Sequence, residues 1–261
     1  MKKKIRILLL LITVALLAFI AYVGLSIIGD EDEGVQEDDE SELVEEPVPQ
    51  EEINNIVILG DSIGSGVGDE ESSGIGDRYL ELMDRDGDET LTNLAISGYT
   101  SSRLVDLIQT GENDATIAEA DLVVISIGGN DLNRLAFQRD LDLPVAFLDT
   151  LNAYLDNLEI IIGDIRTLNP ESEIALIGLY NPYSLIIPEL SDYLIEWNDE
   201  TRSLVESHPD ATYVPTFDLF QDQMENFLYE DYFHPNEEGY QAIAEQLYTL
   251  LNYSTLNPKG F

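Results

Sequence analysis

Apolar runs and amphipathic segments alternate along most of the chain. Five short runs rich in Val, Ile and Leu have the composition of strands that are buried on both faces of a sheet. The longer segments between them carry apolar residues at helical spacing. The expected strands are residues 55–59, 90–95, 122–127, 174–179 and 212–215. This alternation predicts an α/β fold, a three-layer α/β/α sandwich around a five-stranded parallel sheet with right-handed crossovers.

The clearest helix is expected from Phe147 to Leu168, where apolar residues recur at steps of three and four and form a stripe against the sheet. The last helix repeats this pattern. Asn236 is a suitable N-cap for it, and two glutamates follow at the positive end of the helix dipole. The first stripe is Leu148, Leu151, Leu155, Leu158, Ile162, Ile165 and Leu168, and the second is Tyr240, Ile243, Ala244, Leu247, Tyr248 and Leu251.

The N-terminus has a different pattern. Basic residues between Lys2 and Arg6 precede Ile7 to Ile28, a run without charges that is long enough to span a bilayer as a helix. A secretory signal usually has an apolar core of only about 7–15 residues, and the best cleavage candidate, Gly24 to Ser26, is followed by more apolar residues. Residues 1–28 are therefore expected to be an uncleaved signal-anchor, with a cleaved signal peptide as the alternative. The basic cluster keeps the N-terminus cytoplasmic, so the remaining chain is expected outside the cell membrane.

An acidic linker is expected next, because residues 29–52 are dominated by Asp and Glu and contain too few large apolar residues to fold. The folded domain is assigned to residues 53–252 and a C-terminal tail to residues 253–261. Two acidic stretches, 30–34 and 84–88, superficially resemble calcium loops. Both lack the ligand pattern of an EF-hand, so no calcium site is expected.

Candidate chemistry begins at Gly60, where the first strand ends and Asp61 and Ser62 follow. Ligands and catalytic groups collect at the carboxyl ends of strands in an open α/β sheet. Ser62 is therefore placed like a nucleophile. The glycine-rich segment 64–68 should form a turn around it rather than a helix. Taken alone, the triplet favours a βα loop whose serine merely caps the next helix.

A histidine and a carboxylate that suit such a serine lie far downstream. Asp231 precedes His234 by three residues, a spacing that places both side chains on one side of a turn. Histidine can accept the hydroxyl proton near neutral pH, and a carboxylate on its other nitrogen fixes the tautomer. Two more strand ends offer donors for an oxyanion, the backbone N–H of Gly98 and the side-chain amide of Asn130.

These four segments, in this order, resemble the SGNH or GDSL serine hydrolases. The resemblance rests on Ser62, Gly98, Asn130 and the Asp231/His234 pair, and it covers roughly residues 53–252. Ile63 stands where many members have Leu. The resemblance implies a flavodoxin-like strand order and a membrane-anchored extracytoplasmic branch from Gram-positive bacteria. It also implies an oxyanion hole formed by Ser62, Gly98 and Asn130.

Charge limits the partners. All 52 acidic residues lie past residue 28, with 12 − 4 = 8 basic ones, so that part of the chain carries about −44. Such a surface repels nucleic acid and anionic headgroups and leaves small neutral esters or acetylated glycans as substrates. It also indicates a salty or alkaline habitat. The chain has no cysteine, which excludes disulfides and thiolate metal sites.

Two segments that leave the catalytic edge carry apolar residues, Leu132 to Pro144 and Tyr180 to Pro188. They are expected either to line an acyl pocket or to cover the core beneath. Trp197 is expected in the core and His208 at a surface helix end, where without a second ligand it forms no metal site.

The reaction expected from these residues is acyl transfer to water by a serine esterase or lipase, with no metal or organic cofactor. Two alternatives stay open. One is an O-acetyl esterase or acetyltransferase that acts on cell-wall polysaccharide, since it would use the same triad. The other is a non-catalytic binding module on the same fold, against which the intact set of candidate residues argues.

Overall fold

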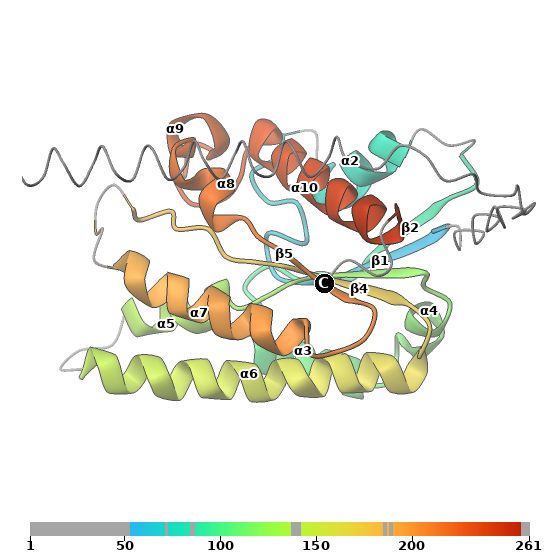
Figure 1. Ribbon diagram of the computed structural model, residues 1–261, viewed down its shortest axis with the longest axis horizontal. Helices are drawn as coiled ribbons and strands as arrows, with labels where there is room; N and C mark the ends of the chain where they lie inside the picture. Colours follow the sequence, from blue (N-terminus) through green and yellow to red (C-terminus); the bar gives the residue numbers. More distant parts are fainter. Residues whose placement is uncertain are drawn as a thin grey trace, which may run out of the picture. The chain divides into compact units, whose positions relative to one another are not determined.

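A five-stranded parallel sheet lies at the centre of the fold, with helices on both faces (Figure 1). The structure, a computed structural model, describes residues 53–70, 73–83, 87–136, 142–184, 187 and 190–256. The strands are β1 (Asn55–Gly60), β2 (Thr90–Asn93), β3 (Leu122–Ser126), β4 (Glu173–Ile177) and β5 (Ala211–Val214). Their order, β2-β1-β3-β4-β5, is the flavodoxin-like order of a doubly wound sheet. The predicted fold class is confirmed, and each predicted strand forms with ends that shift by one or two residues.

Helices form the two outer layers. They are α2 (Gly74–Met83), α3 (Ser101–Gln109), α4 (Asp114–Ala118), α5 (Gly129–Ala136), α6 (Leu143–Leu168), α7 (Leu190–Val205), α8 (Phe217–Gln221), α9 (Met224–Phe227) and α10 (Glu237–Leu256). Helices α3, α6 and α7 pack on one face of the sheet, and α2 and α10 pack on the other (Figure 1).

The sequence of β1 explains why both faces are covered. Ile56 and Ile58 join the core cluster under α2 and α10, whereas Val57 and Leu59 join the cluster under α3 and α6. Each of the four is at most 2% exposed. Successive residues of a strand face opposite sides of the sheet. A strand that is apolar at every position must therefore be covered twice.

Helix α6 confirms the predicted helix and corrects one residue of its stripe. It begins at Leu143, with a proline in the first turn, where the missing N–H costs nothing. Phe147 and Leu151 face the core, but Leu148 is 47% exposed. A step of one residue turns the side chain about 100° around the helix axis. Because Phe147 points inward, Leu148 points toward solvent, and its predicted contact with the sheet is wrong.

Helix α10 follows the prediction closely. The side chain of Asn236 accepts a hydrogen bond from the N–H of Gly239 at 3.0 Å, which is the geometry of an N-cap. Tyr240, Ile243 and Leu247 are completely buried against the sheet. The helix continues to Leu256, into the segment assigned to the tail.

The segment from Leu132 to Pro144, which was predicted as a loop, is partly helical. Its first residues belong to α5 and its last two to α6, while residues 137–141 lie outside the described part. Helix α5 begins almost directly after β3, because Gly128 and Gly129 allow the strand to turn at once into a helix with Asp131 in its first turn. The segment after β4 is a turn over residues 182–184, as expected of a loop.

Trp197 lies in the core, as predicted, with no exposed surface and a tilted ring contact to Tyr154 at 4.4 Å between centroids. His208 follows the end of α7, and its Nε2 lies 3.0 Å from Oε2 of Glu159.

The predicted signal-anchor, residues 1–28, and the acidic linker, residues 29–52, lie outside the described residues, as does part of the segment 84–88. Within the part of the chain that the structure describes, no helix combines the length and the apolar character needed to cross a membrane.

The end of β1 is fixed by a close backbone approach. Gly60 has a φ of 134°, and a Cβ at this position would overlap the carbonyl oxygen of Ser126 on β3. The next N–H, that of Asp61, donates to the same oxygen at 2.9 Å. Only glycine permits this approach, and the chain therefore leaves the sheet immediately before Ser62.

Replacing Gly60 with alanine should destabilise the fold strongly, because it adds both a steric overlap and an unfavourable φ. We expect a loss of at least about 3 kcal/mol, seen as a fall in Tm of roughly 6–12 °C. The matched control is Gly163→Ala in the middle of α6, where the added Cβ would meet nothing within 4 Å. It should raise stability by up to about 1 kcal/mol. A Gly60→Ala protein that melts with the wild type would contradict this account of the strand end.

Candidate active site

Ser62 lies at the carboxyl end of β1, one of the inner strands, in a tight turn that follows the strand. The N–H of Val67 donates to the carbonyl of Ser62 at 3.0 Å, and the N–H of Ser65 donates to the carbonyl of Asp61 at 3.0 Å. These hydrogen bonds close the turn around the serine, as its glycine content predicted. A side chain at Gly68 would collide with the carbonyl of Pro235, so the glycine lets this turn pack against the histidine loop.

The structure brings Ser62, His234 and Asp231 together in one chain of hydrogen bonds. Nε2 of His234 lies 2.9 Å from Oγ of Ser62, and Nδ1 of His234 lies 2.6 Å from Oδ2 of Asp231. Because an ionised carboxylate can only accept, the proton on Nδ1 faces Asp231. The lone pair of Nε2 is then free to accept the hydroxyl proton of Ser62.

Asp231 also holds the loop that carries the histidine. Its Oδ1 accepts the N–H groups of Phe233 at 2.9 Å and of His234 at 3.0 Å. Partial burial acts to raise the pKa of the Asp231 carboxyl, but hydrogen bonds from the His234 ring and from these two N–H groups outweigh it and lower the pKa below the usual value. Asp231 is therefore ionised at neutral pH.

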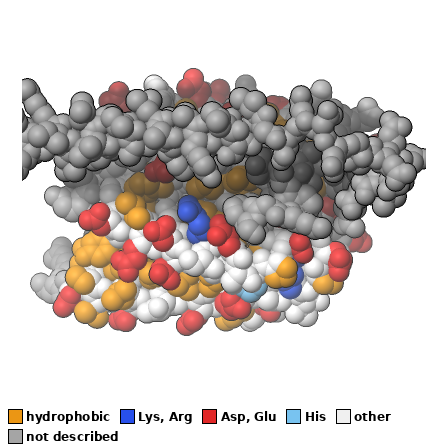
Figure 2. All heavy atoms as spheres, in the orientation of Figure 1, with side chains coloured by type: hydrophobic (Ala, Val, Ile, Leu, Met, Phe, Trp, Pro, Cys, Tyr) orange, Lys and Arg blue, Asp and Glu red, His pale blue; other side chains and the backbone are white. Residues whose placement is uncertain are grey.

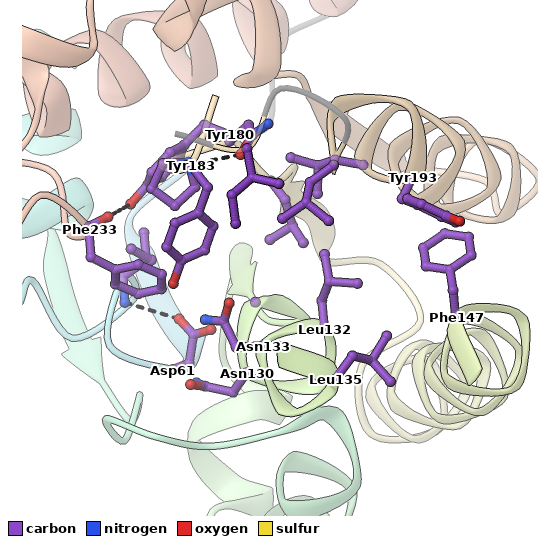
Figure 3. A pocket seen from close by; sticks show the side chains of 18 of the residues that line it. Asp61, Asn130, Leu132, Asn133, Leu135, Phe147, Tyr180, Tyr183, Tyr193 and Phe233 are labelled. Atoms are coloured by element: carbon purple, nitrogen blue, oxygen red, sulfur yellow. Dashed lines mark hydrogen bonds between the residues drawn. The ribbon is translucent and has the colours of Figure 1, made fainter. Parts of the chain in front are cut away.

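A tyrosine from another element fixes the same loop. The hydroxyl of Tyr180, which follows β4, donates to the carbonyl of Phe233 at 2.6 Å (Figure 3). The N–H of Tyr229 donates to the carbonyl of His234 at 2.8 Å. The position of the imidazole thus depends on bonds to its own loop and to the end of β4. Nothing in the sequence pointed to this role of Tyr180 beyond its place after a strand.

Gly98 occupies a tight turn from Ile96 to Tyr99. The N–H of Tyr99 donates to the carbonyl of Ile96 at 3.1 Å, and Gly98, the third residue, has a φ of 82°. This is the pattern of a type II turn, which needs a positive φ at that position. Within the described residues, no hydrogen bond engages the N–H of Gly98 or of Ser62.

Asn130 lies on the wall of the pocket that Ser62 also lines, whereas Gly98 is outside the residues that line it. One N–H of the Asn130 amide donates to the carbonyl of Tyr99 at 2.9 Å, which ties Asn130 to the turn that contains Gly98. An amide nitrogen has two protons, so the other remains for a ligand.

Asp61, for which the sequence predicted no role, immediately precedes Ser62 and lies on the wall of the same pocket (Figure 3). It is 3% exposed, and its Oδ1 accepts the N–H of Ile63 at 3.0 Å and the hydroxyl of Ser126 at 3.3 Å. Burial raises the pKa of this carboxyl to about 7, against the opposing effect of both hydrogen bonds. The signal that could have found it is its place inside the Gly-Asp-Ser triplet. Near neutral pH this carboxyl can gain or lose a proton next to Ser62.

A largely apolar pocket of about 450 Å³ opens beside Ser62 (Figure 3). It runs from Asp61, Asn130 and Phe233 past Leu132 and Leu135 toward Phe147 and Tyr193, whose rings meet edge to face with 4.8 Å between centroids. The remaining lining residues are Ser62, Ile63, Gly129, Asn133, Leu143, Leu179, Tyr180, Asn181, Pro182, Tyr183, Ile187, Leu190 and Leu194. Among the residues that the structure describes, no Lys or Arg lines this pocket. Residues from both predicted segments, 132–144 and 180–188, line this pocket. Of the two alternatives for these segments, lining a pocket or covering the core, the first therefore applies to the residues that line it.

Comparison with known proteins identifies the family of the chain. Residues 58–242 match the GDSL-like Lipase/Acylhydrolase family. The chain is 31% identical over 202 residues to the protein YpmR of Bacillus subtilis (strain 168), with 74% of this chain and 79% of YpmR covered. It is 29% identical over 198 residues to the spore germination lipase LipC of Bacillus licheniformis, with 72% of this chain and 92% of LipC covered.

A solved structure, that of the lipase Lip_vut3 from a goat rumen metagenome, superposes with a TM-score of 0.65 at 25% identity and covers 75% of this chain and 96% of that one. The family match includes the segments that carry Ser62, Gly98, Asn130 and His234. The chain therefore belongs to the GDSL-like Lipase/Acylhydrolase family, and it is an ester-hydrolysing serine hydrolase.

Proposed function

We propose that the protein hydrolyses neutral carboxylic esters through a triad of Ser62, His234 and Asp231. The observation that carries this proposal is the pair of contacts at His234, 2.9 Å to the serine oxygen and 2.6 Å to the aspartate, at the mouth of an apolar pocket. Both distances lie within hydrogen-bond reach, which is the first requirement for a nucleophile and its general base.

In the first half of the reaction, Oγ of Ser62 attacks the ester carbonyl while its proton passes to Nε2 of His234. The ionised Asp231 stabilises the imidazolium that results. The tetrahedral intermediate collapses when the carbon–oxygen bond to the alcohol breaks and His234 returns the proton to the leaving alkoxide. In the second half, water attacks the acyl-enzyme with His234 again as the base, and the carboxylic acid leaves.

The negative charge on the carbonyl oxygen needs donors that are already in place. We assign this role to the N–H groups of Ser62 and Gly98 and to the free N–H of the Asn130 amide. Support comes from the backbone groups, which have no other partner among the described residues. Preorganised donors of this kind are typically among the largest contributions to catalysis, since they cost no reorganisation during the reaction.

The pocket favours an acyl chain longer than acetyl. A group the size of a water molecule takes about 30 Å³ in the liquid, so about 450 Å³ holds on the order of ten such groups. An acetyl group alone would leave most of this apolar wall without contacts. Because no Lys or Arg is among the described residues that line the pocket, they offer no positive charge to hold a phosphate or carboxylate. We therefore place an esterase or lipase ahead of an O-acetyl esterase or acetyltransferase of cell-wall polysaccharide.

If the triad acts as a unit, Ser62→Ala and His234→Ala should each lower kcat for p-nitrophenyl acetate by about 10³-fold or more, and the double variant should be little worse than either. His208→Ala is the matched control, because His208 is the only other histidine of the chain and contacts Glu159 rather than Ser62. It should keep wild-type turnover. Hydrolysis by Ser62→Ala near the wild-type rate would show that the nucleophile lies elsewhere.

The pocket predicts how activity depends on chain length. With p-nitrophenyl esters from acetyl to palmitoyl, kcat/KM should rise by up to about fourfold for each buried methylene and level off once the pocket is full. Leu132→Trp, which narrows the pocket midway, should lower the ratio of octanoyl to acetyl activity. Leu148→Trp places the same ring on the exposed side of α6 and should leave that ratio unchanged. A steady fall in kcat/KM from acetyl onward would contradict a long acyl site.

We further propose that the enzyme works outside the cytoplasmic membrane, held by residues 1–28 as a signal-anchor. Support comes from the basic residues before Ile7 and from the uncharged run to Ile28. In a Gram-positive host, protoplasts should retain the protein in the membrane fraction at its full mass, and added protease should digest the catalytic domain. Recovery of the protein from the medium, beginning near residue 27, would replace the anchor with a cleaved signal peptide.

A further inference from the structure

Two consecutive side chains at the start of α5 bind the turn that contains Gly98. The amide of Asn130 donates to the carbonyl of Tyr99 at 2.9 Å. The carboxylate of Asp131 accepts the N–H of Ser101 at 2.9 Å and the hydroxyl of Ser101 at 2.6 Å. The chain that leaves Gly98 is therefore held at the next residue and again two residues later. Both anchoring residues, Asn130 and Asp131, belong to the same helix, α5.

The other side of the same turn is tied to β1. The N–H of Ile96 donates to the carbonyl of Gly60 at 3.0 Å, and Gly60 lies two residues before Ser62. Gly98 thus lies between one hydrogen bond to the end of β1, two residues before the serine, and three hydrogen bonds to α5. If one side is released, the turn keeps its local shape but loses its fixed position relative to Ser62.

The bond between Asp131 and Ser101 belongs to a partly buried network. Ser101 has no exposed surface, and its Oγ lies 3.0 Å from Nδ2 of Asn157 on α6. The hydroxyl of Ser101 accepts a hydrogen bond from Asn157, so its own proton points toward the carboxylate of Asp131. Burial raises the pKa of the Asp131 carboxyl, while the two hydrogen bonds from Ser101 act in the opposite direction. Burial is the larger effect, so the pKa of Asp131 lies above its usual value.

Asp131 does not line the substrate pocket, although its neighbours Asn130 and Leu132 do. We propose that Asp131 is a positioning residue, which through Ser101 holds the Gly98 turn so that the N–H of Gly98 points at the oxyanion formed on Ser62. The proposal rests on the function proposed above. It assigns to Asp131 no contact with the substrate.

This role predicts a loss in kcat without a matching change in KM. The oxyanion forms only in the transition state, so misplacing one of its donors leaves binding of the ester in the pocket intact. A displacement of about 1 Å typically costs up to ~10²-fold. Asp131→Ala should therefore lower kcat by roughly 10- to 100-fold and leave KM within about threefold.

The test compares Asp131→Ala, Asp131→Asn and a control of equal structural cost, with Tm, kcat and KM measured for each on p-nitrophenyl butyrate. An asparagine still accepts the N–H of Ser101, so Asp131→Asn should recover part of the lost kcat. The control is Asn169→Ala. This buried amide donates to the carbonyls of Ile117 at 3.0 Å and Ala120 at 2.7 Å, at the opposite end of the strands. It should lower Tm but keep the wild-type kcat.

A double variant tests whether Asp131 and Asn130 act on the same turn, the one that contains Gly98. The kcat losses of Asp131→Ala and Asn130→Ala should combine to less than their product. The proposal is overturned if the losses multiply, if Asp131→Ala changes KM alone, or if Asn169→Ala lowers kcat equally. If Asp131→Ala does not fold, Asp131→Asn decides, because a wild-type kcat would overturn the proposal and a several-fold loss at constant KM would support it. Failure of the proposed triad would give a different result: Ser62→Ala would hydrolyse the ester as the wild type does.

Discussion

The hydrogen bond between His234 and Ser62 joins residues that are 172 positions apart in the chain, and the rest of the site depends on it. A contact between residues so far apart in the sequence requires that both segments be held in fixed positions. On one side, the overlap that any side chain at Gly60 would make with β3 fixes where the strand ends. On the other, Asp231 and Tyr180 hold the loop that carries the imidazole. The parallel sheet brings both to one edge, since the carboxyl ends of its strands lie together.

Three aspartates near the serine have three different electrostatic environments. Asp231 receives hydrogen bonds from a ring and two backbone N–H groups, so its pKa falls and it stays ionised. Asp61 is buried at the end of β1, and burial outweighs the hydrogen bonds that it accepts, so its pKa rises to about 7. Asp131 is partly buried, which raises its pKa, and its carboxylate accepts hydrogen bonds from Ser101, three residues past Gly98. The same carboxyl group therefore serves as a partner of the histidine, a titrating neighbour and an anchor for a turn.

The sequence predicted the sheet because β1, β3 and β4 each contain a run of at least four apolar residues, and it predicted the position of the serine because β1 ends at Gly60. It predicted the Asp231–His234 pair because their spacing is local. It could not predict Tyr180, whose hydroxyl reaches a carbonyl 53 residues away. It placed Leu148 in the core, because a pattern of three- and four-residue steps does not tell which of two adjacent apolar residues, Phe147 or Leu148, points inward. Asp61 and Asp131 lay inside recognised motifs, but their roles follow from burial and from partners on other elements.

The central claim is that Ser62 is the nucleophile, activated by His234. The most direct measurement is covalent labelling of the wild-type protein with a fluorophosphonate, followed by peptide mapping of the adduct by mass spectrometry. The account predicts a single adduct on Ser62, with ester hydrolysis lost in proportion to labelling. An adduct on a different serine that abolishes hydrolysis, or full hydrolysis by protein labelled on Ser62, would contradict it.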